Sequence, residues 1–121
     1  MSKIKYQLVK IVVNRSGELI RFSADTDRNY KRVTGLFVSM PTQLALTGSS
    51  LELSIADIEI FPEGFEAKFL NTGENVAPDD RFYTIESEAK GNRIDGKFID
   101  GGNAEKYPYK AFLYLKHEDK F

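Results

Sequence analysis

This sequence of 121 residues contains no cysteine, no tryptophan and only one histidine. The lack of cysteine excludes a disulfide framework, a thiolate metal site and a cysteine nucleophile. A single histidine, His117, argues against metal centres that are built from several imidazoles. No Gly-x-Ser-x-Gly segment is present to position a catalytic serine. We therefore predict that the protein is not an enzyme and that it holds no cofactor and no metal ion.

Long hydrophobic runs and a strong excess of one charge are also missing. No apolar run approaches the roughly 20 residues that cross a membrane, and the first residues, Met-Ser-Lys-Ile-Lys-Tyr-Gln, lack the apolar stretch of a secretory signal peptide. The net charge is −1, whereas nucleic-acid binders usually carry a basic excess. We predict a soluble protein that has no signal peptide, does not insert into a membrane and does not bind nucleic acid.

Two polar segments resemble functional motifs without completing them. The segment from Asp25 to Asn29 begins like a calcium-binding loop, but Tyr30 stands where glycine is needed and Leu36 stands where glutamate is needed. His117 lies in a charged segment, His117-Glu118-Asp119-Lys120, so we predict that it is solvated near the chain end.

The charges are unevenly distributed along the chain. Residues 1–40 hold eight basic and three acidic side chains, whereas residues 41–121 hold nine basic and fifteen acidic ones. Such a chain can fold into a mixed surface. If the two halves face different sides, the basic residues of one copy can meet the acidic residues of another in a head-to-tail contact.

Alternation of apolar and polar residues dominates the chain and predicts an all-β fold. It recurs over eight or nine short segments separated by turn signals, and only residues 42–50 suggest a helical turn. We predict one domain over residues 1–121, an antiparallel β-sandwich of jelly-roll type, with an immunoglobulin-like sandwich as the alternative. The predicted core residues are Leu36, Val38, Leu53, Ile55, Phe65, Phe69, Phe98 and Leu113. The last strand, residues 107–116, is apolar on both faces, which predicts that it is covered on both sides.

The stretch EIFPEGFEAKFL, residues 59–70, predicts a hairpin whose corner is Phe61-Pro62-Glu63-Gly64. Strand alternation after the corner places Phe65 and Phe69 in the core. Alternation before it places Phe61 on the polar side, where its ring could contact a partner. The residues that we predict at a partner contact are Phe61, Tyr30, Lys3, Lys5, Arg28, Lys31 and Arg32.

A chain of this size that is all-β and has no cysteine, no signal peptide and no catalytic motif resembles a known family. It is similar to the single jelly-roll vertex (penton-type) capsid proteins of tailless icosahedral phages with double jelly-roll major capsid proteins. The resemblance spans nearly the whole chain and implies a structural virion protein. It also implies a cyclic homo-oligomer, a pentamer at the five-fold vertex of the capsid, which contacts the major capsid protein and a spike.

A different class of function also fits the sequence. The alternative is a monomeric, cytoplasmic binding module for a glycan or a peptide. It would use loops 25–30, 71–80 and 100–106 together with Phe61 or Tyr30. The two hypotheses differ in whether copies of the chain associate.

Overall fold

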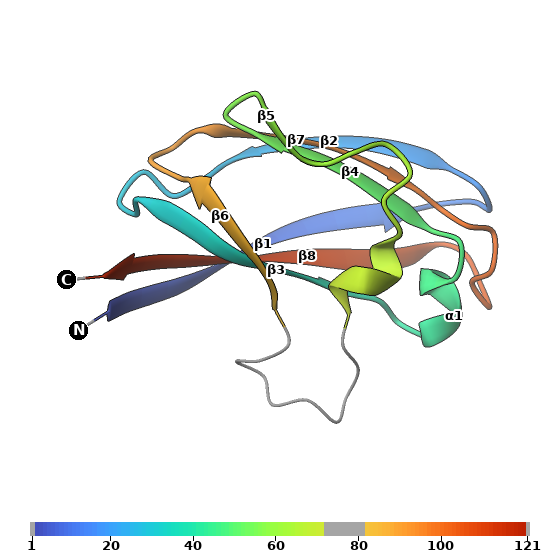
Figure 1. Ribbon diagram of the computed structural model, residues 1–121. Helices are drawn as coiled ribbons and strands as arrows, with labels where there is room; N and C mark the ends of the chain where they lie inside the picture. Colours follow the sequence, from blue (N-terminus) through green and yellow to red (C-terminus); the bar gives the residue numbers. More distant parts are fainter. Residues whose placement is uncertain (1, 72–81, 121) are drawn as a thin grey trace.

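The computed structural model describes residues 2–71 and 82–120, which form two four-stranded antiparallel sheets packed as a sandwich (Figure 1). The first sheet has the strand order β1-β8-β3-β6, with the bounds Ser2–Val13, Tyr109–Lys120, Arg32–Ser39 and Tyr83–Glu88. The second has the order β2-β7-β4-β5, with the bounds Leu19–Asp25, Arg93–Ile99, Ser50–Ile55 and Ile58–Phe61. The predicted β-sandwich is confirmed. Most of the predicted loop 71–80, and Arg81, lie outside the described residues.

The strand pairing is that of a jelly roll. β1 pairs with β8, β2 with β7, β3 with β6 and β4 with β5, each time antiparallel. This nested order results when one long hairpin with its tip between β4 and β5 is rolled up, and eight strands in two Greek keys define the jelly roll. The immunoglobulin-like alternative, with its ABED and CFG sheets, is excluded.

The core lies between the two sheets and is built from the inward residues of their central strands. Of the eight predicted core residues, six are buried: Leu36, Val38, Leu53, Ile55, Phe98 and Leu113. Phe65 is half-buried and Phe69 is 55% exposed. The prediction for Phe69 is wrong because residues Ala67–Leu70 form a 3₁₀ helix, η1, instead of a strand. Three residues per turn bring Ala67 and Leu70 inward together and leave Phe69 outside.

The turn at Pro62-Glu63-Gly64 does not reverse the chain. Phe61 pairs with Leu53 of β4, and beyond the turn Glu66 pairs with Ser50 of the same strand, both antiparallel. The chain therefore continues along β4 in one direction, and the turn is a bulge in the edge strand. The predicted hairpin corner is wrong.

The actual reversal lies at Ala56-Asp57, between β4 and β5. Both residues have positive φ, 55° and 63°, as a two-residue hairpin turn with the twist of a β-sheet requires. The apolar alternation changes phase at this point, from Leu51, Leu53 and Ile55 to Ile58 and Ile60, which requires the chain to bulge, turn or change sheets.

A register shift next to this hairpin turns Phe61 inward. Between Ser54 and Leu53 the pairing slips by one residue, so that Glu59 is opposite Ser54 and Phe61 is opposite Leu53. The slip moves Phe61 to the core side, where it is 3% exposed and its ring stacks on Phe65 with the centroids 4.3 Å apart. The predicted exposure of Phe61 is wrong, because a bulge inverts the alternation.

The outer face of the β1-β8-β3-β6 sheet carries half-buried aromatic residues. Tyr114 of β8 lies opposite Phe37 of β3, with the ring centroids 6.3 Å apart, and Phe112 is also half-buried. The prediction that β8 is fully covered on both sides is therefore wrong for this outer face.

The helices of the described residues are short. α1, Gln43–Leu46, is capped by the Thr42 hydroxyl, which accepts a hydrogen bond from the Ala45 N–H, and it confirms the helical turn predicted in residues 42–50. Within residues 2–71 and 82–120, no helix has the length and apolar character needed to cross a membrane.

Candidate functional site

Six of the seven predicted contact residues lie at the end of the sandwich where β1 begins and β8 ends (Figure 1). Lys3 and Lys5 lie near the start of β1. Arg32 begins β3, whose start pairs with the end of β8. The other three are Arg28, Tyr30 and Lys31 in the loop between β2 and β3. The seventh, Phe61, is on β5 and does not join them.

His117 is buried at this end of the sandwich. β8 is paired on both sides, with Lys5 of β1 and Val33 of β3 opposite His117. The side chains of β8 therefore keep alternating between the two faces of the sheet as far as His117. Like Leu113 and Leu115, His117 faces inward, and it is 0% exposed. The prediction of a solvated histidine is wrong. The alternation itself would have located His117 on the inner face, but the charged composition of residues 117–120 argued for a strand end.

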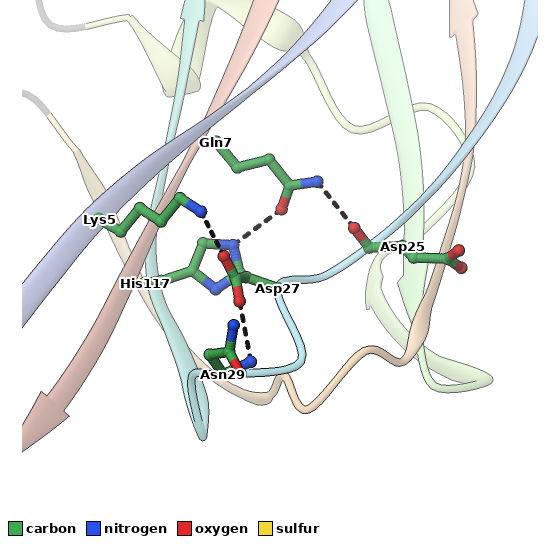
Figure 2. Close-up of polar contacts among 6 residues, drawn as sticks. All are labelled: Lys5, Gln7, Asp25, Asp27, Asn29 and His117. Carbon is green, nitrogen blue, oxygen red and sulfur yellow. Dashed lines mark hydrogen bonds and ion pairs between the residues drawn. The ribbon is translucent and has the colours of Figure 1, made fainter.

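Hydrogen bonds fix the tautomer of His117 (Figure 2). The Gln7 side-chain amide donates from Nε2 to the backbone oxygen of Asp25 at 2.8 Å. Its Oε1 therefore faces His117 Nε2, at 2.8 Å, and this nitrogen must carry the hydrogen. The other ring nitrogen, Nδ1, is buried and makes no hydrogen bond within the described residues.

An ion pair lies beside the imidazole (Figure 2). The Asp27 carboxylate accepts hydrogen bonds from Lys5 Nζ and from the backbone N–H of Asn29. These bonds hold the pKa of Asp27 below its ordinary value, and the bond to Asp27 raises the pKa of Lys5. Burial lowers the pKa of His117, although the nearby Asp27 charge acts in the opposite direction. The histidine is therefore neutral next to a charged pair.

Tyr30 closes the cluster from the loop side. It is buried, its ring centroid lies 5.7 Å from that of His117, and Lys3 Nζ lies 4.9 Å from the centroid of the Tyr30 ring. The ring is part of the interior, so it does not offer the surface that the predicted contact of Tyr30 with a partner requires. The basic members of the predicted contact set are exposed: Lys3, Lys5, Arg28, Lys31 and Arg32.

The cluster of Lys5, Gln7, Asp27, Tyr30 and His117 joins three separate segments of the chain. β1, the loop before β3, and β8 all contribute to it. The imidazole is enclosed, so substrate cannot reach it in this conformation. Within the described residues, no three His, Asp or Glu side chains are arranged to hold a metal ion. The geometry thus suits a structural connection whose strength depends on the protonation of His117.

We expect the stability of the protein to decrease as the pH falls below about 6.5, the value for histidine in an unfolded chain. The folded-state pKa of His117 is lowered, so the unfolded state binds more protons in the window between the two pKa values, and the free energy of unfolding declines with falling pH there. His117→Gln should remove this slope, because His117 is the only histidine. Urea unfolding between about pH 7.5 and about pH 5.5 measures the free energy of unfolding against pH. The same pH dependence in the unmodified protein and in His117→Gln would contradict the expectation.

A second buried polar cluster surrounds Asp100 at the opposite end of the β1 and β8 pair. Its Oδ2 accepts hydrogen bonds from the N–H groups of Gly17 and Gly102, at 2.9 and 3.0 Å, and from the Tyr107 hydroxyl at 2.6 Å. Its Oδ1 accepts one from the Tyr109 hydroxyl at 2.6 Å. Burial opposes ionisation, but these four bonds outweigh it and hold the pKa of Asp100 below its ordinary value. The carboxylate connects the turn after β1 to the segment before β8.

A groove with a volume of about 450 Å³ lies near the Asp100 cluster. It separates the end of β3 from the segment that enters β8. Its apolar wall consists of Met40, Pro41, Ala104, Pro108, Tyr109 and Phe112.

No family model matches the chain, and neither the curated proteins nor the solved structures give a match.

Proposed function

We propose that this protein is a non-enzymatic assembly protein, a jelly-roll capsid component that closes into a cyclic homo-oligomer in a virion. The observation that carries the proposal is the nested strand pairing, β1-β8-β3-β6 facing β2-β7-β4-β5. Viral capsid domains are one of the principal uses of this fold. Because one fold serves several functions, the surface of this chain must supply the rest of the argument.

The distribution of polar chemistry supports a structural role. The two buried polar clusters described above form internal hydrogen bonds: His117 bonds Gln7, and Asp100 accepts four bonds from its own chain. Each cluster connects segments that are far apart in the sequence. Six of the eight exposed large apolar side chains of the described residues, by contrast, lie on strands at the sheet edges, where another subunit can cover them.

The proposal includes a position in the particle. By resemblance to the penton-type capsid proteins, the oligomer is a pentamer at a five-fold vertex, with the major capsid protein and a spike as its neighbours. Five exposed basic side chains at one end of the sandwich are a candidate surface for one of these neighbours: Lys3, Lys5, Arg28, Lys31 and Arg32.

The mass of the purified protein in solution tests self-assembly. We expect light scattering at low salt to give one closed oligomer, with a mass that is a multiple of the 13.7 kDa chain, fivefold for a vertex protein. High salt should weaken it, because charged contacts are screened. A monomer at both salt concentrations would contradict the proposal.

The second candidate, a monomeric binding module for a glycan or a peptide, is favoured by the groove of about 450 Å³ beside β8. Its apolar wall, with the rings of Tyr109 and Phe112, suits a ligand with an apolar face. A monomeric mass would give this candidate priority, and a glycan and peptide screen would follow.

A further inference from the structure

The exposed large apolar side chains of this protein are concentrated on its edge strands. Seven of the eight such residues in the described chain lie on the four edge strands or on η1, the next element after β5. They are Ile4, Tyr6 and Leu8 on β1, Leu19 on β2, Ile58 on β5, Phe69 on η1 and Tyr83 on β6. Edge strands are normally protected from association by charge or cover, so exposed apolar residues at these positions indicate an interaction surface.

Apart from Tyr6, whose ring stacks on that of Phe82 with the centroids 5.4 Å apart, these residues form two groups on opposite sides of the sandwich. β1 and β2 are consecutive strands at one edge of their respective sheets, and β5 and β6 are at the other edge (Figure 1). We call these surfaces the β1/β2 flank and the β5/β6 flank. The second flank is continuous across the two sheets, because the Phe61 ring of β5 contacts the Tyr83 ring of β6, with the centroids 5.5 Å apart.

The two flanks carry opposite charge. β1 and β2 contain four basic residues and one acidic residue: Lys3, Lys5, Lys10, Arg21 and Asp25. β5 and β6 contain three acidic residues and no basic one: Glu59, Glu86 and Glu88. The strands of the two flanks are therefore of opposite net charge, although Lys5, Glu86 and Glu88 also form ion pairs within the same copy, with Asp27, Arg32 and Lys90.

We propose that the β1/β2 flank of one copy of this chain packs against the β5/β6 flank of the next copy. The proposal rests on the proposed function, whose subunit contact it specifies. Apolar residues on both flanks supply the burial, and the charges set the orientation, because contact between two identical flanks would bring like charges together. A contact between two different surfaces is head-to-tail, and it forms a ring when the rotation between subunits closes.

The strand directions are compatible with this arrangement. Neighbouring strands in β1-β8-β3-β6 are antiparallel throughout, so β1 and β6 run in opposite directions. A copy placed beside β6 in the same orientation therefore brings its β1 alongside β6 in antiparallel alignment, the common arrangement of sheet neighbours.

Charge reversal on each flank tests the contact in the full chain. The first variant carries Lys10→Glu and Arg21→Glu on the β1/β2 flank, and the second carries Glu59→Lys and Glu88→Lys on the β5/β6 flank. All four side chains are exposed, so the fold should tolerate the changes. Each variant presents two flanks of like sign, and we expect its association constant to fall on the order of 100-fold. The variant with all four substitutions regains complementary flanks and should regain the oligomer.

A matched control reverses two exposed charges on central strands. Arg93→Glu on β7 and Lys110→Glu on β8 change the net charge as much as the first variant does, and should leave the oligomer intact. Light scattering is the readout, with circular dichroism to verify folding. Loss in both flank variants and recovery in the fourfold variant would support the proposal. An oligomer that responds to the flank variants no more than to the control would overturn the contact and leave the proposed function standing, whereas a monomeric unmodified chain would overturn both.

Discussion

Replacing Asp100 by alanine is expected to lower the free energy of unfolding by about 3 to 5 kcal/mol. The substitution removes the acceptor of four hydrogen bonds at once and leaves two backbone N–H groups and two phenol hydroxyls without their partner. Asp100 is buried, so water cannot replace the carboxylate fully. The melting temperature should fall by on the order of 10 to 20 °C. Urea unfolding followed by circular dichroism measures the change.

Two further variants separate the carboxylate from the loop that carries it. Asp100→Asn retains the shape and one acceptor oxygen, so its cost should be about 1 to 2 kcal/mol. Glu105→Ala removes an exposed acid from the same segment and should change stability by less than about 0.5 kcal/mol. If Asp100→Ala were as mild as Glu105→Ala, the four bonds would not stabilise the fold as argued.

The charge of Asp100 also predicts a dependence on acid. The folded-state pKa is lowered, so the stabilisation is complete above the unfolded value of about 3.9 and is lost as the pH falls through the folded pKa. The decline in stability below about pH 4 should accordingly be shallower in Asp100→Asn than in the unmodified protein.

Gly101→Ala is expected to destabilise the protein by about 2 to 4 kcal/mol, for a purely steric reason. A Cβ atom at this position would lie 2.3 Å from the Thr47 carbonyl oxygen and 2.5 Å from the carbonyl carbon of Gly48. Both are backbone atoms, so no side-chain rotation can relieve the overlap. Ser49 holds this turn in place, since its hydroxyl donates to the Ala45 oxygen at 2.7 Å and accepts from the Gly101 N–H at 3.0 Å.

Gly64→Ala provides the contrast to Gly101→Ala. Gly64 has a φ of +87° and no atom within 4 Å of an added Cβ, so alanine there costs only the backbone strain of about 1 to 2 kcal/mol. Chemical unfolding should rank Gly101→Ala below Gly64→Ala in stability. The reverse order would mean that the segments around Thr47 and Gly101 separate easily.

Local alternation predicted the fold class and most of the core, because it reports directly which side of a strand faces inward. Leu53, Ile55, Phe98 and Leu113 are buried where the pattern placed them. Phe61 was misplaced because its orientation depends on a bulge in its pairing with β4, and pairing between strands leaves no local trace in the sequence. Phe69 was misplaced because the 3₁₀ helix changes the period from two to three.

The candidate site was predicted only in part, for a related reason. The basic residues Lys3, Lys5 and Arg32 were expected at one contact surface, and the structure places them at the same end of the sandwich. The partners of these residues could not be predicted. Lys5 meets Asp27 only when β1 lies beside the loop after β2, and Gln7 meets His117 only once β1 and β8 are aligned. His117 and Gln7 are 110 positions apart. The residues around one of them do not indicate that the other will be its hydrogen-bond partner.

The nested pairing has a consequence for how the protein folds. β8 is an interior strand of its sheet that separates β1 from β3, yet it follows all the other described strands in the sequence. During synthesis β1 is made before β8 and lacks its sheet neighbour until residues 109–120 follow, while β4 and β5 can form their hairpin early. The long loop between β1 and β8 must close against its entropy before their ladder forms, which makes a fold of this kind slow to complete. β1 exposes Ile4 and Leu8 while it lacks its sheet neighbour. Association between newly made chains therefore competes with folding until β8 has been synthesised.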